Sequence, residues 1–181
     1  MHRNYLARRI RRHGTEYILK QGNTLQPFSA YLKNGNTLMV TALELPTGSL
    51  IAPLARPDRE YLVAGMEDLK LYELYSLQRI NCRASLARFD ATGAKDTFGR
   101  PAATGATLIY SDIPLYLHPS VNPTDQTTAA ISATSTTYRF SVPNGFTIRS
   151  KDQLYIGDST LTVTALLVQP DGITSFTAQD S

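Results

Sequence analysis

The sequence has 181 residues, of which 42% are hydrophobic and 18% charged, and its net charge is +3. This apolar content is enough to build a core and excludes a wholly disordered chain. No apolar run reaches the roughly 18 residues of a membrane-spanning helix, so we expect no membrane partner. The single cysteine, Cys82, excludes an internal disulfide and a cysteine-rich zinc site.

Positive charge is concentrated at the N-terminus. Residues 1–12 contain no acid and five arginines, which are Arg3, Arg8, Arg9, Arg11 and Arg12. The arm formed by residues 1–14 is typical either of a contact with phosphate or an acidic protein surface, or of a solvated terminus. Leu6 and Ile10 lie four residues apart, which predicts a short helix over Asn4–Arg12 that needs a partner surface for stability.

The chain that follows the arm predicts a β-meander. Strands are expected at Thr15–Lys20, Pro27–Leu32 and Thr37–Leu45. The last two flank an Asn34-Gly35 pair, which is a hairpin signal because both residues tolerate a positive φ. Prolines and glycines between residues 46 and 65 predict a loop that contains one strand, Tyr61–Ala64.

The segment Met66–Leu77 is ambiguous, because its apolar residues fit a helical face as well as an alternating strand. The spacing of Met66, Leu69 and Leu77 favours a short helix. The next segment, Gln78–Phe89, alternates more clearly and predicts one strand. Cys82 would lie on the apolar face of that strand, where we expect it to be buried and inert.

Strand signals are clearest in the C-terminal part of the chain. Alternation is strongest over Thr160–Val168, which is expected to form a hairpin with Gln153–Ile156 across Gly157-Asp158-Ser159. Long loops are expected at residues 90–105 and 118–137, because these segments are rich in small and polar residues. Further strands are expected at Ala106–Leu117, Tyr138–Val142, Phe146–Arg149 and Ile173–Ala178.

These elements predict a mainly β fold, which is a small antiparallel β-barrel or sandwich with long loops, a basic N-terminal arm and at most one or two short helices. No repeat with a period of about 20–50 residues is visible, so we expect a single β-rich domain over residues 15–181. Strand edges and a detachable arm are features of assemblies, so this layout favours an interaction protein.

Catalytic, metal and cofactor motifs are absent from the sequence, so we expect neither an enzyme nor a cofactor. His2 and His13 lie in the basic arm, where a solvated role is favoured. His118 has Asp112 nearby in sequence, but no nucleophile at a motif spacing. Asp152 could pair with Asp158, although both flank a hairpin where aspartate is favoured for turn geometry alone.

Several segments of the C-terminal half resemble the head-completion, or head–tail connector, proteins of tailed bacteriophages. The resemblance covers roughly residues 80–180 and is a pattern of strands and polar turns, with no catalytic signature. The segments that carry it are Arg83–Asp90, Ile109–Pro114, Tyr138–Pro143, Ile148–Asp152 and Tyr155–Val163.

This resemblance implies a structural virion protein of the neck, in which copies of a small β-barrel form a six- or twelve-fold ring between portal and tail and help to retain packaged DNA. It implies a location at the head–tail junction, and in the host cytoplasm during assembly. The arginines Arg3, Arg8, Arg9, Arg11 and Arg12 would contact the portal or, without sequence specificity, DNA. Contacts between subunits would come from the long loops, with Asp90, Gly93, Lys95, Asp96, Arg100, Asn122 and Asp125 as candidate residues.

Two other classes of protein remain open on the sequence alone. The first is a different phage structural component, such as a tail terminator, a baseplate protein or a capsid decoration protein, which would share the composition and differ in location. The second is a soluble β-barrel binding module, which would need a pocket lined by converging aromatic residues.

Overall fold

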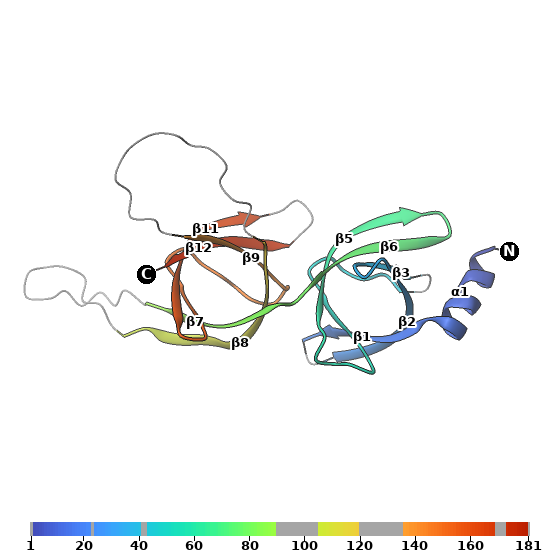
Figure 1. The fold of residues 1–181 in the computed structure, drawn as a ribbon, viewed down its shortest axis with the longest axis horizontal. Helices are drawn as coiled ribbons and strands as arrows, with labels where there is room; N and C mark the ends of the chain where they lie inside the picture. The colour runs from blue at the N-terminus through green and yellow to red at the C-terminus, as the bar shows by residue number, and fades with distance from the viewer. Residues whose placement is uncertain are drawn as a thin grey trace, which may run out of the picture. The chain divides into compact units, whose positions relative to one another are not determined.

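The computed structural model describes residues 2–22, 24–40, 43–89, 105–119, 136–168 and 173–180. Within these residues the chain forms one helix and twelve strands, and the strands build two closed barrels (Figure 1). The expected fold class, a mainly β protein built on small antiparallel barrels with little helix, is therefore confirmed. Among the described residues, no helix has the length and apolar character needed to cross a membrane.

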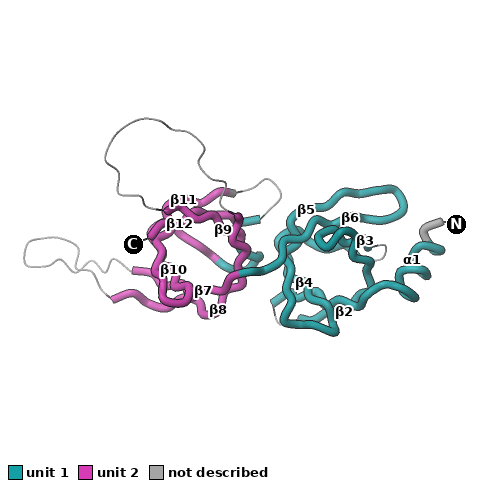
Figure 2. The backbone as a smooth tube through the Cα atoms, viewed as in Figure 1, with its two compact units in different colours: residues 1–81, 142–146, 168–174 teal, residues 82–141, 147–167, 175–181 magenta. Residues whose placement is uncertain are grey.

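The chain divides into two compact units, each of which contains one six-stranded barrel (Figure 2). Unit 1 comprises residues 1–81, 142–146 and 168–174, and unit 2 comprises residues 82–141, 147–167 and 175–181. The sequence predicts one domain over residues 15–181, whereas the contacts within the structure divide these residues between the two units. The first boundary falls between Asn81 and Cys82.

The barrel of unit 1 has the strand order β1-β2-β3-β6-β5-β4 and closes where β4 pairs with β1. Strands β1, β2 and β3 are neighbours in chain order, and they are followed round the barrel by β6, β5 and β4, in reverse chain order. The bounds are β1 Thr15–Gln21, β2 Thr24–Lys33, β3 Thr37–Val40, β4 Leu50–Pro53, β5 Tyr61–Leu69 and β6 Tyr72–Arg79.

The first hairpins follow the sequence signals closely. The turn between β2 and β3 has Asn34 at φ 54° and Gly35 at φ 75°, the left-handed pair that an Asn-Gly hairpin requires. By contrast, β4 was not expected, because proline cannot donate a backbone hydrogen bond and the prolines around this segment predicted a loop. It is accommodated because Pro53 ends the strand and Ile51 and Ala52 are fully buried.

The helix favoured for residues 66–77 is wrong, since these residues belong to the hairpin β5–β6. The two strands pair from Tyr61 opposite Arg79 to Leu69 opposite Tyr72. Tyr75 and Leu77 alternate into the core of unit 1, and their burial stabilises a strand in spite of the helical spacing. A register shift between Val63 and Gly65 also broke the alternation that would have revealed β5.

The helix expected in the N-terminal arm is present as α1, His2–His13. Ile10 is only 5% exposed and anchors the helix to unit 1 beside β2. Gly14 ends the helix, and its backbone N–H donates to the carbonyl oxygen of Ile10 at 2.6 Å. The chain is tight at this point, since a Cβ on Gly14 would lie 2.4 Å from the Ile10 oxygen and 2.7 Å from the Ala30 oxygen.

Gly14→Ala should therefore destabilise the attachment of α1 to β2 by about 1–3 kcal/mol, because backbone atoms must move to admit the methyl group. Gly65→Ala is the matched control, because a Cβ at Gly65 meets no atom within 4 Å. Amide hydrogen exchange over residues 4–14 measures the effect. Equal exchange in the two variants would contradict the proposed close approach.

Unit 1 also includes residues 142–146, which contact the turn before β4. The backbone N–H of Asn144 donates to the Gly48 oxygen at 2.9 Å, and its Nδ2 donates to the Thr47 oxygen at 2.7 Å. Gly48 has φ +83°, and a Cβ there would lie 2.5 Å from Oδ1 of Asn144. Glycine is therefore required at position 48 both by backbone conformation and by space.

The barrel of unit 2 repeats the topology of unit 1. Its strand order is β7-β8-β9-β12-β11-β10, which is the unit 1 order with each strand number raised by six. Stacked Phe140 and Phe176, with ring centroids 5.3 Å apart, lie in its core. The bounds are β7 Cys82–Arg88, β8 Thr107–Leu117, β9 Thr137–Val142, β10 Gln153–Ile156, β11 Ser159–Val168 and β12 Thr174–Asp180.

The expected strand at Phe146–Arg149 is wrong, because these residues form an irregular segment that leads into a turn. The other C-terminal strands are confirmed. Most of the two predicted loops, residues 90–104 and 120–135, lies outside the described residues.

Candidate functional site

The residues expected to form contacts between subunits are not among those that the structure describes. They are Asp90, Gly93, Lys95, Asp96, Arg100, Asn122 and Asp125. The five arginines all belong to α1, with Arg3 in its first turn. The remaining four are exposed. At 3.6 residues per turn, Arg8 and Arg12 lie opposite Ile10, whereas Arg9 and Arg11 flank it.

The exposed arginines of α1 form a basic surface that consists of Arg8, Arg9, Arg11 and Arg12. Arg8 and Arg12 are one helical turn apart, where like charges repel and destabilise a helix. Arg11 and Arg12 lie in the last turn, where the helix dipole partly offsets this cost. Within the described residues, none of the four forms an ion pair.

A groove of about 300 Å³ lies between α1 and strand β2. Its walls are partly apolar, and Arg11 brings one positive charge to it. Phe28 on the strand side is stacked on Tyr17 at 5.8 Å between ring centroids, so that wall is supported by the core. The lining residues are Ala7, Ile10, Arg11, Gln26, Pro27, Phe28, Ser29 and Leu43.

The far end of hairpin β5–β6 carries exposed apolar and acidic side chains. Met66 is 51% and Leu71 is 42% exposed, and Glu67 and Asp68 are also exposed. Asp68 lies directly opposite Glu73 in the register, a like-charge cross-strand pair that is locally unfavourable. In the described part of the chain, neither Glu67 nor Asp68 forms an ion pair.

Tyr75 connects this hairpin to the core of unit 1. Its hydroxyl donates to a Glu73 carboxylate oxygen and accepts the backbone N–H of Leu45 at 2.9 Å. Burial raises the pKa of Tyr75 strongly, and the hydrogen bond to Glu73 raises it further. The phenol therefore stays protonated and acts as a fixed structural donor.

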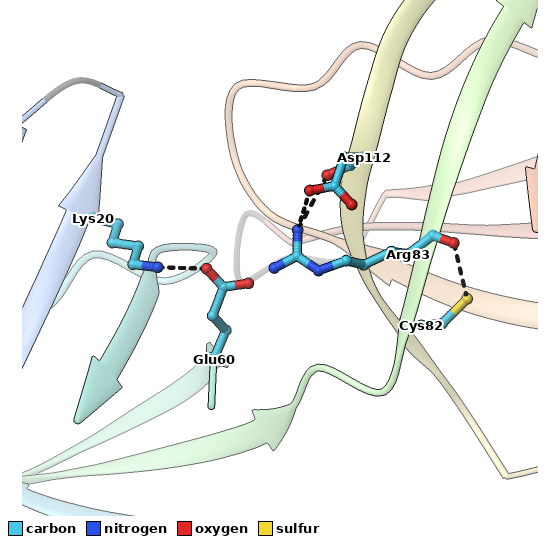
Figure 3. A network of polar contacts seen from close by, with 5 residues as sticks. All are labelled: Lys20, Glu60, Cys82, Arg83 and Asp112. Atoms are coloured by element: carbon cyan, nitrogen blue, oxygen red, sulfur yellow. Dashed lines mark hydrogen bonds and ion pairs between the residues drawn. The ribbon is translucent and has the colours of Figure 1, made fainter. Parts of the chain in front are cut away.

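Other polar residues of both units form ion pairs with structural roles (Figure 3). In unit 1, Nζ of Lys20 lies 2.6 Å from Oε1 of Glu60, whose side chain is 8% exposed. In unit 2, Nη1 of Arg83 lies 2.6 Å from Oδ2 of Asp112, and this pair is exposed. Burial raises the pKa of the half-buried Cys82 thiol, which disfavours the reactive thiolate.

His118 bonds to Ser141, whereas Asp112, the aspartate considered from sequence, pairs with Arg83. Nε2 of His118 lies 2.7 Å from Oγ of Ser141, which lies 3.0 Å from Oγ of Ser175. The two serines are 1% and 0% exposed, so a substrate cannot reach either hydroxyl. The group is therefore a buried polar network within unit 2.

The stability of unit 2 should fall as the pH drops through about 6.5, the ordinary pKa of an unfolded histidine. Burial, with a smaller contribution from Arg139, lowers the pKa of His118 in the folded chain. The unfolded chain therefore binds the proton first, and stability is lost until the folded pKa is also passed. Urea unfolding at several pH values measures this slope. His118→Gln should flatten it, and His13→Gln, a change at an exposed site, should not.

Asp152 is the charged group that sequence reasoning misassigned. It is 1% exposed and forms a two-pronged ion pair with Arg88, with Nε–Oδ1 and Nη2–Oδ2 distances of 2.8 Å. Its Oδ2 also accepts the backbone N–H of Arg149 at 2.8 Å. Asp158 is exposed in the β10–β11 turn, so the considered carboxylate pair does not form. No local pattern links Arg88 with a partner 64 residues away.

The described residues contain no group of three or more histidine, cysteine, aspartate or glutamate side chains able to hold a metal ion. What the structure brings together is a basic helix surface, a groove beside it and an exposed acidic hairpin, all within unit 1.

No protein-family model and no curated protein matches the chain. Among solved structures, it is similar to K. pneumonia MrkH in its apo state, with 11% identity over 99% of this chain and 83% of that chain and a TM-score of 0.29. The K. pneumonia MrkH–c-di-GMP complex gives 14% identity, coverages of 98% and 83%, and a TM-score of 0.28. The Bacillus subtilis inhibitor of motility, MotI/DgrA, gives 12% identity, coverages of 93% and 88%, and a TM-score of 0.23. Similarities this low support no conclusion about function.

Proposed function

We propose that this chain is a structural virion protein of the phage head–tail connector, a subunit of a ring that joins portal to tail and helps to retain packaged DNA. One observation carries the proposal. The five segments that resemble connector proteins begin near residue 80, and unit 2 begins at Cys82. The resemblance thus falls largely within one compact unit, and its segments supply residues of β7, β8, β9, β10 and β11.

The physical character of both units supports this role. Each barrel is filled by fully buried apolar side chains, such as Leu38 in unit 1 and Phe140 in unit 2. Closed, filled barrels are rigid and have few free edges, which suits a subunit that transmits load between larger assemblies. The basic surface of α1 is the part suited to an acidic portal surface or to DNA phosphates.

Electron microscopy of particles that contain the chain tests the proposal. Density for the paired barrels is expected as a closed ring between portal and tail. Particles assembled without the chain should lack attached tails and should lose packaged DNA. Density at the tail tip or on the capsid surface would assign the chain to another structural component, and its absence from particles would refute a virion role.

A further inference from the structure

We infer that unit 1 carries both halves of a contact between copies of this chain, in which the β5–β6 hairpin of one copy docks on the α1 groove of another. The inference rests on the proposed function, because a ring requires contacts between copies, and it names the surfaces that form one such contact. It uses the charge and exposure of two surfaces, defined here as the hairpin tip, residues 66–73, and the α1 surface, Arg8, Arg9, Arg11 and Arg12 with the groove.

The end of the hairpin tip, residues 69–72, extends past the strands that flank it. Among the described residues, β4 pairs with β5 only at Tyr61 and Leu62, and β3 pairs with β6 only as far as Glu73. Figure 1 shows the end of this hairpin projecting from the ring of strands. Its turn, Lys70-Leu71, presents the exposed Leu71 side chain at the extremity. A projecting hairpin with an apolar end is suited to insertion into a partner.

The two surfaces are opposite in charge. The hairpin tip has three acids, Glu67, Asp68 and Glu73, against Lys70, which gives a net charge of −2. The α1 surface has four arginines and no acid. Each surface repels itself, through Asp68 opposite Glu73 on the hairpin and through Arg8 above Arg12 on the helix. Bringing the two surfaces together relieves both repulsions and gives the complementarity that sets partner choice.

The groove supplies the apolar part of the contact. Its 300 Å³ can hold a leucine side chain, and Pro27, Phe28 and Leu43 offer apolar walls. With Leu71 in the groove, the carboxylates of the same hairpin lie beside Arg11 at its rim and beside Arg8, one helical turn before Arg11. A second copy is favoured over DNA as the occupant because DNA phosphate could use the arginines but would leave Leu71 and the apolar walls of the groove, Pro27, Phe28 and Leu43, without a partner.

A charge-exchange experiment on the full chain tests this contact by sedimentation velocity at low and high salt. Arg8→Glu with Arg11→Glu, and Glu67→Lys with Asp68→Lys, should each weaken self-association about tenfold or more, since like charges then face each other. Combining all four changes should restore association to near the wild-type level. Asp58→Lys with Asp158→Lys, which makes the same charge change at exposed sites elsewhere, should leave it unchanged.

Leu71→Ala tests the apolar half of the contact, because it removes the inserted side chain at a site that is 42% exposed. It should weaken association and leave the thermal unfolding of the separate chain unchanged. A wild-type chain that stays monomeric at every concentration and salt would overturn the inference. Failure of the combined variant to regain self-association would also overturn it. If the combined variant regains only the thermal stability of a monomer, the two surfaces contact each other within one chain, which would likewise overturn the inference. Arginine variants that lose DNA binding while the acidic variants associate normally would assign the helix to DNA.

The inference and the proposed function fail in different ways. If the chain enters particles but does not associate through these surfaces, the connector function stands and the inferred contact is refuted. If the chain associates through these surfaces but is absent from particles, the inferred contact stands and the connector function is refuted. The charge-exchange variants are therefore to be scored in both assays, by sedimentation and by incorporation into particles.

Discussion

Replacing Arg88 by methionine is expected to destabilise unit 2 by about 3–5 kcal/mol, because the change leaves the Asp152 carboxylate buried without its partner. The side chain of Asp152 is 2% exposed and that of Arg88 is 16% exposed, so water cannot replace the lost bonds. Asp152 also holds the Arg149 backbone N–H, and a shift of its side chain would loosen the turn that precedes β10.

Hydrogen exchange of peptides from β7 and β10 measures this effect within unit 2, which matters because two units need not unfold in one step. Arg139→Met is the control, since it removes an exposed arginine of unit 2 and should change stability by about 0.5 kcal/mol or less. Equal effects at Arg139 and Arg88 would contradict the structural importance of the buried pair.

The second large effect is expected at Tyr75, which is fully buried in unit 1. Tyr75→Ala should cost about 3–5 kcal/mol through the cavity that it leaves. Tyr75→Phe keeps the ring and removes only the hydroxyl, which leaves the buried Leu45 N–H without its acceptor and should cost about 1–3 kcal/mol.

Tyr31→Phe is the control for this change, because Tyr31 is 51% exposed and its loss of a hydroxyl should alter stability by about 0.5 kcal/mol or less. Exchange of the Leu45 amide is the direct reporter, and it should become faster in Tyr75→Phe. Continued protection of that amide, with unchanged stability, would show that the hydroxyl is dispensable.

Local signals in the sequence predicted the elements whose stability is itself local. Each of these signals depends on residues that are close together in the sequence. They are the Asn34-Gly35 and Gly157-Asp158 turns, the strong alternation of β11 and the spacing of Leu6 and Ile10. They were sufficient to predict the β-rich class and helix α1, and both are confirmed.

Features that depend on distant residues could not be predicted in the same way. The β5–β6 hairpin has a helix-like spacing of apolar residues, and only the barrel core around Tyr75 and Leu77 selects the strand. The pairing of Arg88 with Asp152 spans 64 residues and leaves no local pattern. The repetition of one strand order in both barrels is likewise a property of pairing, which different side chains can satisfy without a visible repeat.

The contact of Asn144 with Thr47 and Gly48 has a consequence for synthesis on the ribosome. All six strands of the first barrel are translated by Arg79, but Asn144 follows 65 residues later. At about 5–20 residues per second, the nascent barrel waits on the order of 3–13 s for it. During that interval the Thr47 and Gly48 carbonyl groups lack their native donor, so a stalled or prematurely terminated chain exposes the turn before β4 to chaperones and proteases.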